Sequence, residues 1–223
     1  SQAALGQISV GRGNDFGFGA GIPHELEAAC AALAQGHRKW IDVGFVQGGD
    51  YPQGRYFGNG VGIGFDAVVG FVAARQERLS GFLSYVVAAL KTMFLYYHAP
   101  LVQLDFNGES RTMPALMVSV MNGRRMGGGF MMAPEGSMED GEFTCCLVQQ
   151  VSRPAILALI PKFMQGTQGA HPAVRMEKTS HLVVTALKGT LPAHADGETL
   201  CEAGQRLEMT LFPALLEVIV PQS

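Results

Sequence analysis

The sequence is poor in charged residues. Only 16% of its 223 residues are charged, whereas about a quarter is usual, and 48% are hydrophobic. The formal net charge of −3 argues against nucleic acid as a partner, because nucleic-acid-binding proteins carry a basic face. A surface with so little charge indicates that part of it forms a groove or an interface.

Cysteine is also scarce and shows no metal-binding pattern. The four cysteines stand at positions 30, 145, 146 and 201, and neither they nor the six histidines have metal-ligand spacing. We interpret the cysteines as reduced packing residues of a cytoplasmic protein.

Long apolar runs are missing too. The longest, residues 82–97, is interrupted by Ser84, Lys91 and Thr92 and is shorter than the roughly 20 residues that span a bilayer. Residues 1–4 have neither the basic start nor the apolar core of a signal peptide. We expect residues 82–97 to form a packed core helix, or alternatively one wall of an apolar groove.

Hydrophobic periodicity predicts an α+β chain with many short strands. Strands are predicted at residues 5–10, 39–46, 55–63, 102–106, 110–120, 130–132, 143–151, 174–179, 181–187, 207–212 and 215–220. Helices are predicted at residues 23–35, at residues 67–97 with a break near 79–81, and at residues 154–165. So many short strands are best buried in a mainly antiparallel, two-layer β-sandwich with a few helices.

A glycine-rich loop follows the first predicted strand. Five glycines fall between Gly11 and Ile22, and such a loop lets the backbone approach a ligand closely. A domain rarely begins with one buried strand followed at once by a loop of this kind. We therefore expect the chain to start inside a larger fold.

The late segment His194-Ala195-Asp196-Gly197-Glu198 has two interpretations. Asp-Gly between two strands is a strong hairpin signal, which favours a plain turn. If the segment is extended instead, residues two apart share a face, so His194, Asp196 and Glu198 point the same way. Asp196 is then a candidate general base with Glu198 as its acidic companion. These residues alone leave both interpretations open.

Several motifs together resemble the catalytic family of diacylglycerol kinases. This family includes sphingosine kinases and bacterial lipid kinases, and it is related to NAD kinases. Residues 11–16 are similar to its G-T-x-N-D-F-A segment, and residues 57–67 to its F-x-N-x-x-G-x-G-F-D-A. Three more motifs follow in the family's order. The first is a segment made of Asn122, residues 127–129, Pro134 and residues 140–141. The second is the helix at residues 154–165 with its glycine stop, and the third is the D-G-E at residues 196–198.

The family's phosphate loop, G-G-D-G-T, has no convincing counterpart. Residues 47–51 (Q-G-G-D-Y) come after the N-D segment instead of before it, and we predict a plain turn there. The resemblance implies that residues 1–38 form the tail of a nucleotide-binding domain with an interdomain loop and helix. Residues 39–223 would form the β-sandwich lipid-substrate domain, and its last strand, 215–220, would pack back on the missing domain.

The resemblance also implies catalytic and nucleotide-binding roles. Asp196 would be the base, and Glu198 would orient it or help to hold a metal. Arg12, Asn14 and Asp15 would face the phosphates of ATP or their Mg²⁺, although Arg12 departs from the family's threonine. Apart from the resemblance, residues 14 and 15 fit an ordinary helix cap or loop turn equally well.

A structural magnesium site is implied at residues 137–142. Its ligands would be the Ser137 carbonyl, the Asp140 carboxylate and the Glu142 carbonyl, since Mg²⁺ prefers oxygen ligands. A solvated acidic turn is the alternative. Arg124 and Arg125, followed by methionines and Phe130, suggest either a lipid-entry rim or a strand core beside two solvated arginines.

The main hypothesis is the C-terminal part of an ATP-dependent lipid kinase. It would phosphorylate a diacylglycerol-, sphingosine- or phosphatidylglycerol-like lipid at the membrane surface, as a cytoplasmic peripheral protein, and this part alone would be inactive. The alternatives are a non-catalytic lipid-binding module and an NAD kinase-like enzyme. Because the first and last strands would leave unpaired edges, we expect a homodimer or a strand-exchanged oligomer.

Overall fold

The computed structural model describes residues 3–11, 13–75, 81–95 and 99–222. Its α-helices are α1 (Asp15–Ala20), α2 (Leu26–Gln35), α3 (Phe65–Ala74), α4 (Gly81–Leu95) and α5 (Arg153–Gln165), and α5 is followed by the 3₁₀ helix η1 (Gln168–Ala170). Its strands are β1 (Arg38–Gly48), β2 (Tyr51–Phe57), β3 (Gly60–Gly64), β4 (Leu101–Phe106), β5 (Glu109–Met121), β6 (Phe143–Gln149), β7 (Val174–Thr179), β8 (His181–Lys188), β9 (Leu191–Ala195), β10 (Glu198–Gly204) and β11 (Arg206–Ile219).

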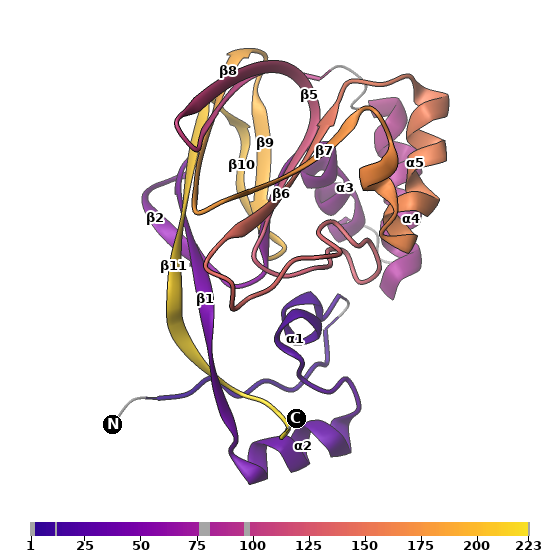
Figure 1. Cartoon of the computed structure of the whole chain (residues 1–223). Helices are drawn as coiled ribbons and strands as arrows, with labels where there is room; N and C mark the ends of the chain where they lie inside the picture. Colours follow the sequence, from indigo (N-terminus) through magenta and orange to yellow (C-terminus); the bar gives the residue numbers. More distant parts are fainter. Residues whose placement is uncertain (1–2, 12, 76–80, 96–98, 223) are drawn as a thin grey trace.

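The strands form two antiparallel layers that share the long strand β5 (Figure 1). The first layer has the order β2-β1-β11-β8-β4 and ends on the first half of β5. The second has the order β10-β9-β3, continues with the second half of β5, and ends with β6 and β7. This arrangement confirms the predicted two-layer β-sandwich.

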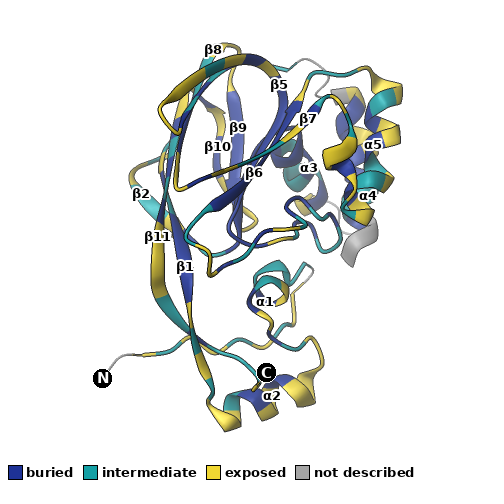
Figure 2. Ribbon diagram, in the orientation of Figure 1, coloured by how far each residue is buried: buried dark blue, intermediate teal, exposed yellow. Residues whose placement is uncertain are grey.

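Strands β5 and β6 of the second layer each serve two hydrophobic cores. On β6, Cys145 belongs to the core between the layers and its neighbour Cys146 to the core beneath the helices. On β5, Val118 and Met117 divide in the same way. This division follows from the period of two along a strand. Helices α3, α4 and α5 cover the outer face of this layer, and Figure 2 shows the buried residues concentrated there and between the sheets.

The described residues before β1 lie beside the far end of the sandwich. Strands β1 and β11 extend beyond the body of the sheets and reach α2 near the chain termini (Figure 1). A small core there joins Ala20 of α1 to Ile41 and Val218 on these strands and to Met138. The N-terminal segment contributes one parallel bridge, Leu5 to Val218, so the predicted strand at residues 5–10 is wrong beyond Leu5.

Several other predicted elements need correction. The predicted strand at residues 55–63 is broken at Gly58 and Asn59, which places β2 and β3 in different layers. The predicted strands at 207–212 and 215–220 form one strand, β11, because Ala214 (φ 47°) lies in an irregularity that the β1 pairing absorbs.

Three further differences concern short elements. Residues 130–132 form only a bridge between Met126 and Phe130, and the glycine loop contains the short helix α1. Strands β9 and β10 were not predicted at all. The predicted helix at residues 67–97 is confirmed as α3 and α4, although most of its expected break, residues 79–81, lies outside the described residues.

Candidate active site

Asp196 and Gly197 form the turn between β9 and β10. Their φ angles are 49° and 87°, and a two-residue hairpin of type I′ requires positive φ at both positions. The hairpin interpretation is therefore correct, and the extended segment is not formed. A turn is nevertheless compatible with a functional Asp196, because the side chain is aimed by its contacts with another part of the chain.

Three backbone amides at the break between β2 and β3 hold the Asp196 carboxylate. Oδ2 accepts a hydrogen bond from the amide of Gly58 at 2.7 Å. Oδ1 accepts bonds from the amides of Asn59 at 3.0 Å and Gly60 at 2.9 Å. The carboxyl group is thereby turned inward from an exposed turn. Its loss of hydration raises the pKa of Asp196, and the amide bonds oppose that rise.

Glu198 points to a different partner. Its carboxylate lies 2.7 Å from the guanidinium of Arg55, and its side chain is 69% exposed. The positive charge of Arg55 in turn lowers the pKa of Asp196 and partly offsets the effect of burial. The link between the two carboxylates therefore runs through Arg55.

A large polar cleft lies in front of Asp196. It encloses about 1730 Å³, including the part that is open to solvent. Among the described residues, Asn14 and Asp15 line one wall, Asp196 and Gly197 line another, and Glu198 is not part of the lining. The structure thus brings together three of the residues that the resemblance singled out. Arg12 lies outside the described residues.

Asp15 is the centre of a half-buried network. Its Oδ1 accepts a hydrogen bond from Nε of Arg125 at 2.8 Å, and the amide of Gly128 donates to the same carboxylate at 3.1 Å. The Arg125 guanidinium also stacks over the ring of Phe18, 4.1 Å from its centroid. The expectation of a solvated arginine is therefore wrong for Arg125, which anchors α1 to the loop that follows β5.

Asn14 stands at the N-cap position of α1 but does not cap it. Its side chain instead closes the glycine loop: Oδ1 accepts from the amide of Gly11 at 2.9 Å, and Nδ2 donates to the carbonyl of Gly11 at 3.0 Å. The backbone of Asn14 is left-handed, with φ 54°, which asparagine tolerates better than most residues. Of the two ordinary alternatives for Asn14, the helix cap is therefore wrong, and the side chain instead closes a loop turn.

The predicted magnesium loop is paired with a lysine. Nζ of Lys178 lies 2.7 Å from Oδ2 of Asp140, and the Glu142 amide donates to Oδ1 of Asp140 at 3.3 Å. The Ser137 hydroxyl accepts from the amide of Glu139 at 3.2 Å. Within the described residues, no group of three or more His, Cys, Asp or Glu side chains is arranged to hold a metal. The Asp140 carboxylate thus already pairs with a cation, the Lys178 ammonium, and a Mg²⁺ ion at Oδ2 would compete with it.

Two buried polar residues were overlooked as candidates in their own right. Asp66 in the first turn of α3 is 6% exposed, and the hydroxyl of Ser119 donates to its Oδ2 at 2.6 Å. Burial raises the pKa of Asp66 to about 7, and the bond from Ser119 only partly opposes this rise. Burial likewise lowers the pKa of His194 to about 4. The signal for Asp66 was present in the sequence, as a carboxylate inside the otherwise apolar start of a helix.

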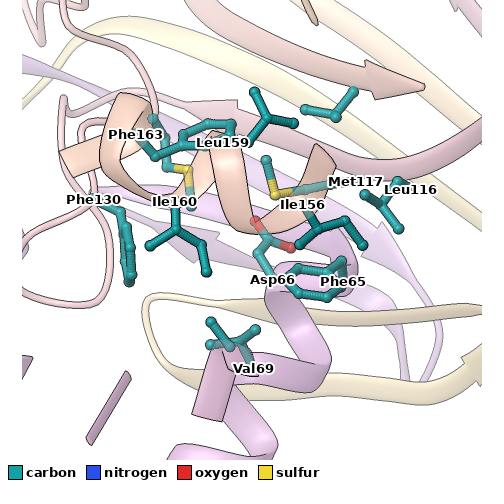
Figure 3. Close-up of a pocket in the computed structure, with 13 residues that line it drawn as sticks. Phe65, Asp66, Val69, Leu116, Met117, Phe130, Ile156, Leu159, Ile160 and Phe163 are labelled. Atoms are coloured by element: carbon teal, nitrogen blue, oxygen red, sulfur yellow. The ribbon is translucent and has the colours of Figure 1, made fainter. Parts of the chain in front are cut away.

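An apolar pocket adjoins the cleft (Figure 3). It encloses about 530 Å³, including its open part, and Asp66 supplies the one carboxylate among its lining residues. Those residues are Phe65, Asp66, Val69, Ala89, Leu116, Met117, Phe130, Met132, Val148, Ile156, Leu159, Ile160 and Phe163.

Among the described residues, no helix is both long enough and apolar enough to cross a bilayer.

The fold is a two-layer antiparallel sandwich in which a hairpin presents a carboxylate to a cleft. Residues 59–220 match the family described as the YegS C-terminal NAD kinase beta sandwich-like domain. The chain belongs to this family, and the match confirms the resemblance inferred from the motifs.

Named relatives cover nearly the whole chain. A diacylglycerol kinase of Mycobacterium tuberculosis is 28% identical over 98% of this chain and 69% of its own length. A Pseudomonas aeruginosa protein named "Probable lipid kinase YegS-like" is 29% identical over 99% of this chain and 69% of its own length.

Solved structures from Bacillus anthracis share the fold. One, titled as a diacylglycerol kinase, aligns with a TM-score of 0.66 at 18% identity over 94% of this chain and 64% of that chain. A second aligns with a TM-score of 0.73 at 20% identity over 98% of this chain and 70% of that chain. These alignments confirm the predicted fold class.

Proposed function

We propose that this chain is the C-terminal part of an ATP-dependent lipid kinase, which transfers the γ-phosphate of ATP to a lipid hydroxyl. The observation that carries the proposal is the position of Asp196. Its inward-turned carboxylate lines a polar cleft together with Asn14 and Asp15, and that cleft adjoins an apolar pocket. Relatives named diacylglycerol kinase and lipid kinase support the same reaction class.

Asp196 would act as the general base. A lipid hydroxyl is a poor nucleophile until a group accepts its proton. Asp196 takes that proton while the hydroxyl oxygen forms a bond to the γ-phosphorus and the bond from that phosphorus to the β-phosphate oxygen breaks. The products are ADP and a phosphorylated lipid. The raised pKa of Asp196 makes it a stronger base, and the amides of residues 58–60 keep it in place.

Glu198 would act as a positioning residue. It pairs with Arg55, whose charge influences Asp196, and it does not line the cleft among the described residues. The pair therefore supports an orienting role for Glu198 through the guanidinium.

The nucleotide would approach from the wall formed by α1. Asn14 and Asp15 would face the phosphates, and Arg12 would contribute a further charge there. Mg²⁺, when bound with ATP, neutralises the charge that develops on the transferring phosphoryl group. A second, structural Mg²⁺ at Ser137, Asp140 and Glu142 remains part of the proposal, with Lys178 as its competitor.

The test is ATP-dependent phosphorylation by the full-length protein of diacylglycerol, sphingosine and phosphatidylglycerol in mixed micelles. Asp196→Asn should lower kcat by about 10²–10⁴-fold while retaining cooperative unfolding. Glu198→Gln should cause a smaller loss. Glu109→Gln is the matched control, because Glu109 is an exposed carboxylate that lines neither the cleft nor the apolar pocket.

Two results would count against the proposal. Wild-type turnover in Asp196→Asn would remove the base assignment. Failure of the wild-type protein to phosphorylate any of the three lipids would remove the kinase assignment.

The second candidate is a non-catalytic lipid-binding module, which the apolar pocket favours. Co-sedimentation with liposomes in the absence of nucleotide, combined with no phosphorylation by the full-length protein, would support it. The same experiment tests the proposed peripheral association with a membrane. The NAD kinase-like alternative has less support, because the relatives named above are lipid kinases.

A further inference from the structure

A row of polar side chains crosses the second layer beneath α3. Ser119 on β5 is in register with Gly62 on β3, and Gly62 is in register with His194 on β9. Thr199 on β10 continues the row and lines the cleft. Helix α3 packs on β3 and β9, so its first-turn residue Asp66 meets the row from above.

Gly62 makes room for two of these groups. A Cβ atom at this position would lie 2.6 Å from Nε2 of His194 and 2.7 Å from Oδ2 of Asp66. Both contacts are shorter than real Cβ atoms allow. The missing side chain therefore lets the imidazole and the carboxylate reach the same point of the sheet.

The row holds buried polar atoms that have no partner. Oδ1 of Asp66 and Nδ1 of His194 have no hydrogen-bond partner of good geometry within the described part of the protein, and each residue is only 6% exposed. The backbone amides of Asp66 and Ala67 lie close enough to the Asp66 carboxylate to oppose the rise of its pKa. An unpaired buried polar atom carries a substantial free-energy cost, so native proteins rarely keep one without a reason. These two atoms are therefore suited to a ligand.

Asp66 stands where the two cavities meet. It lines both the polar cleft and the apolar pocket, as do Val69, Phe130 and Met132. Figure 3 shows its carboxylate pointing into a ring of apolar side chains from α3, β5 and α5. A lipid that places an alkyl chain in the pocket and its reacting hydroxyl in the cleft would have to pass Asp66.

We propose that Asp66 is the specificity residue for the lipid, and that it hydrogen-bonds the neutral polar linkage, a hydroxyl or ester, at the head of an alkyl chain bound in the apolar pocket. This inference rests on the proposed function, from which it takes the lipid nature of the ligand. A neutral linkage fits better than an amine. The surrounding walls are apolar, and placing an ion pair there would require desolvating both charges.

The test is binding to the full-length protein without nucleotide, so that it does not depend on phosphoryl transfer. The probe is dioctanoylglycerol, measured by calorimetry, with short-chain sphingosine as the amine-bearing comparison. Asp66→Leu should weaken dioctanoylglycerol binding about tenfold or more. Asp66→Asn should weaken it less than about threefold, because a carboxamide still donates and accepts hydrogen bonds.

Two further variants make the result specific. Ile160→Trp should block the pocket and abolish binding while the protein remains folded by circular dichroism, because Ile160 is only partly buried in the lining. Glu109→Gln, which removes an exposed carboxylate that lines neither cavity, should bind like the wild type.

The proposal is overturned if Asp66→Leu or Ile160→Trp binds dioctanoylglycerol as tightly as the wild type. It is also overturned if the wild type prefers the sphingosine probe and Asp66→Asn loses it, which would make the ligand an amine. If the expected binding pattern holds but no lipid is phosphorylated, the kinase proposal fails and the binding assignment stands.

Discussion

At the scale of single residues, the chain contains carboxylates in very different surroundings. Asp66 is buried among apolar side chains, Asp196 is turned into an amide cage, and Asp140 is paired with a lysine. A free carboxylate oxygen in an apolar wall lowers stability, so Asp66 carries a cost that a purely structural residue would not need. We associate that cost with ligand binding.

The destabilisation that results from burying the Asp66 carboxylate depends on pH. Its pKa is raised from 3.8 to about 7, so the folded protein binds this proton more tightly than the unfolded chain does. Stability from this group is therefore present below pH 3.8 and is lost as the pH rises towards 7. Asp66→Asn cannot ionise, and its free energy of unfolding should exceed that of the wild type by roughly a few kcal/mol near pH 8 and by less near pH 5. Urea unfolding of both proteins measures this, and an equal difference at both pH values would contradict it.

Lys178 should compete with Mg²⁺ for Asp140. Its ammonium lies 2.7 Å from the carboxylate and its side chain is 46% exposed, so it is free to withdraw. Lys178→Met should therefore show a larger rise of Tm with added MgCl₂ than the wild type does. Asp140→Asn is the control and should abolish the rise in the Lys178→Met background. Equal responses with and without Asp140 would exclude the predicted ligand.

At the scale of elements, the important feature is the contact between two chain reversals. The β9–β10 turn supplies Asp196, and the break between β2 and β3 supplies the amides that hold it. The break also moves the chain from one layer to the other. Both features therefore serve the sandwich and the candidate site at once.

Two glycines provide a matched pair of variants that test whether the β9–β10 turn positions Asp196. Gly197 (φ 87°) lies in the Asp196 turn, Gly108 (φ 76°) lies in the turn between β4 and β5, and an added Cβ would meet no atom within 4 Å at either position. Alanine should therefore cost each protein about 1–2 kcal/mol through backbone strain alone. Only Gly197→Ala should also lower kcat, because it displaces Asp196. Equal kcat values for the two variants would show that the turn does not position the base.

At the scale of the whole molecule, the first layer has an exposed apolar face. Phe45, Tyr56 and Phe212 form an aromatic cluster on β1, β2 and β11, and Trp40 and Leu215 on the same strands are also exposed. Exposed apolar patches commonly mark interaction surfaces. This cluster lies where β1 pairs with the edge strand β2, and Tyr56 is on that edge strand.

We expect this chain to self-associate through that face. Sedimentation velocity over a range of concentrations should show dimers or larger strand-exchanged species for the wild type. The double variant Tyr56→Ser and Phe212→Ser should shift the distribution to monomers. Ser substitution of Leu187, which is exposed on β8 away from the cluster, is the control. A wild type that stays monomeric at high concentration would reject the expectation.

The sequence by itself determined the local features and the family. Alternating apolar residues predicted the sandwich, the Asp196-Gly197 pair favoured a hairpin turn that the structure shows with positive φ, and the ordered motifs identified the relatives. Each of these depends on residues close together in the chain or on a pattern that repeats along it. The break at residues 58–59 and the single strand β11 depend instead on partners from distant segments. Strand β9 likewise pairs with the distant β3, whereas β10 pairs with β9 across a local turn.

Only the tertiary structure decided how the site is assembled. Asp196 is held by amides more than a hundred residues earlier in the chain, with a separation of 138 residues to Gly58. Ser119, Gly62 and His194 share one row only because β5, β3 and β9 are neighbours in the sheet. Burial then sets the direction of the pKa shifts at Asp66 and His194. A periodic pattern cannot show which buried groups meet, because strand pairing between distant segments determines it.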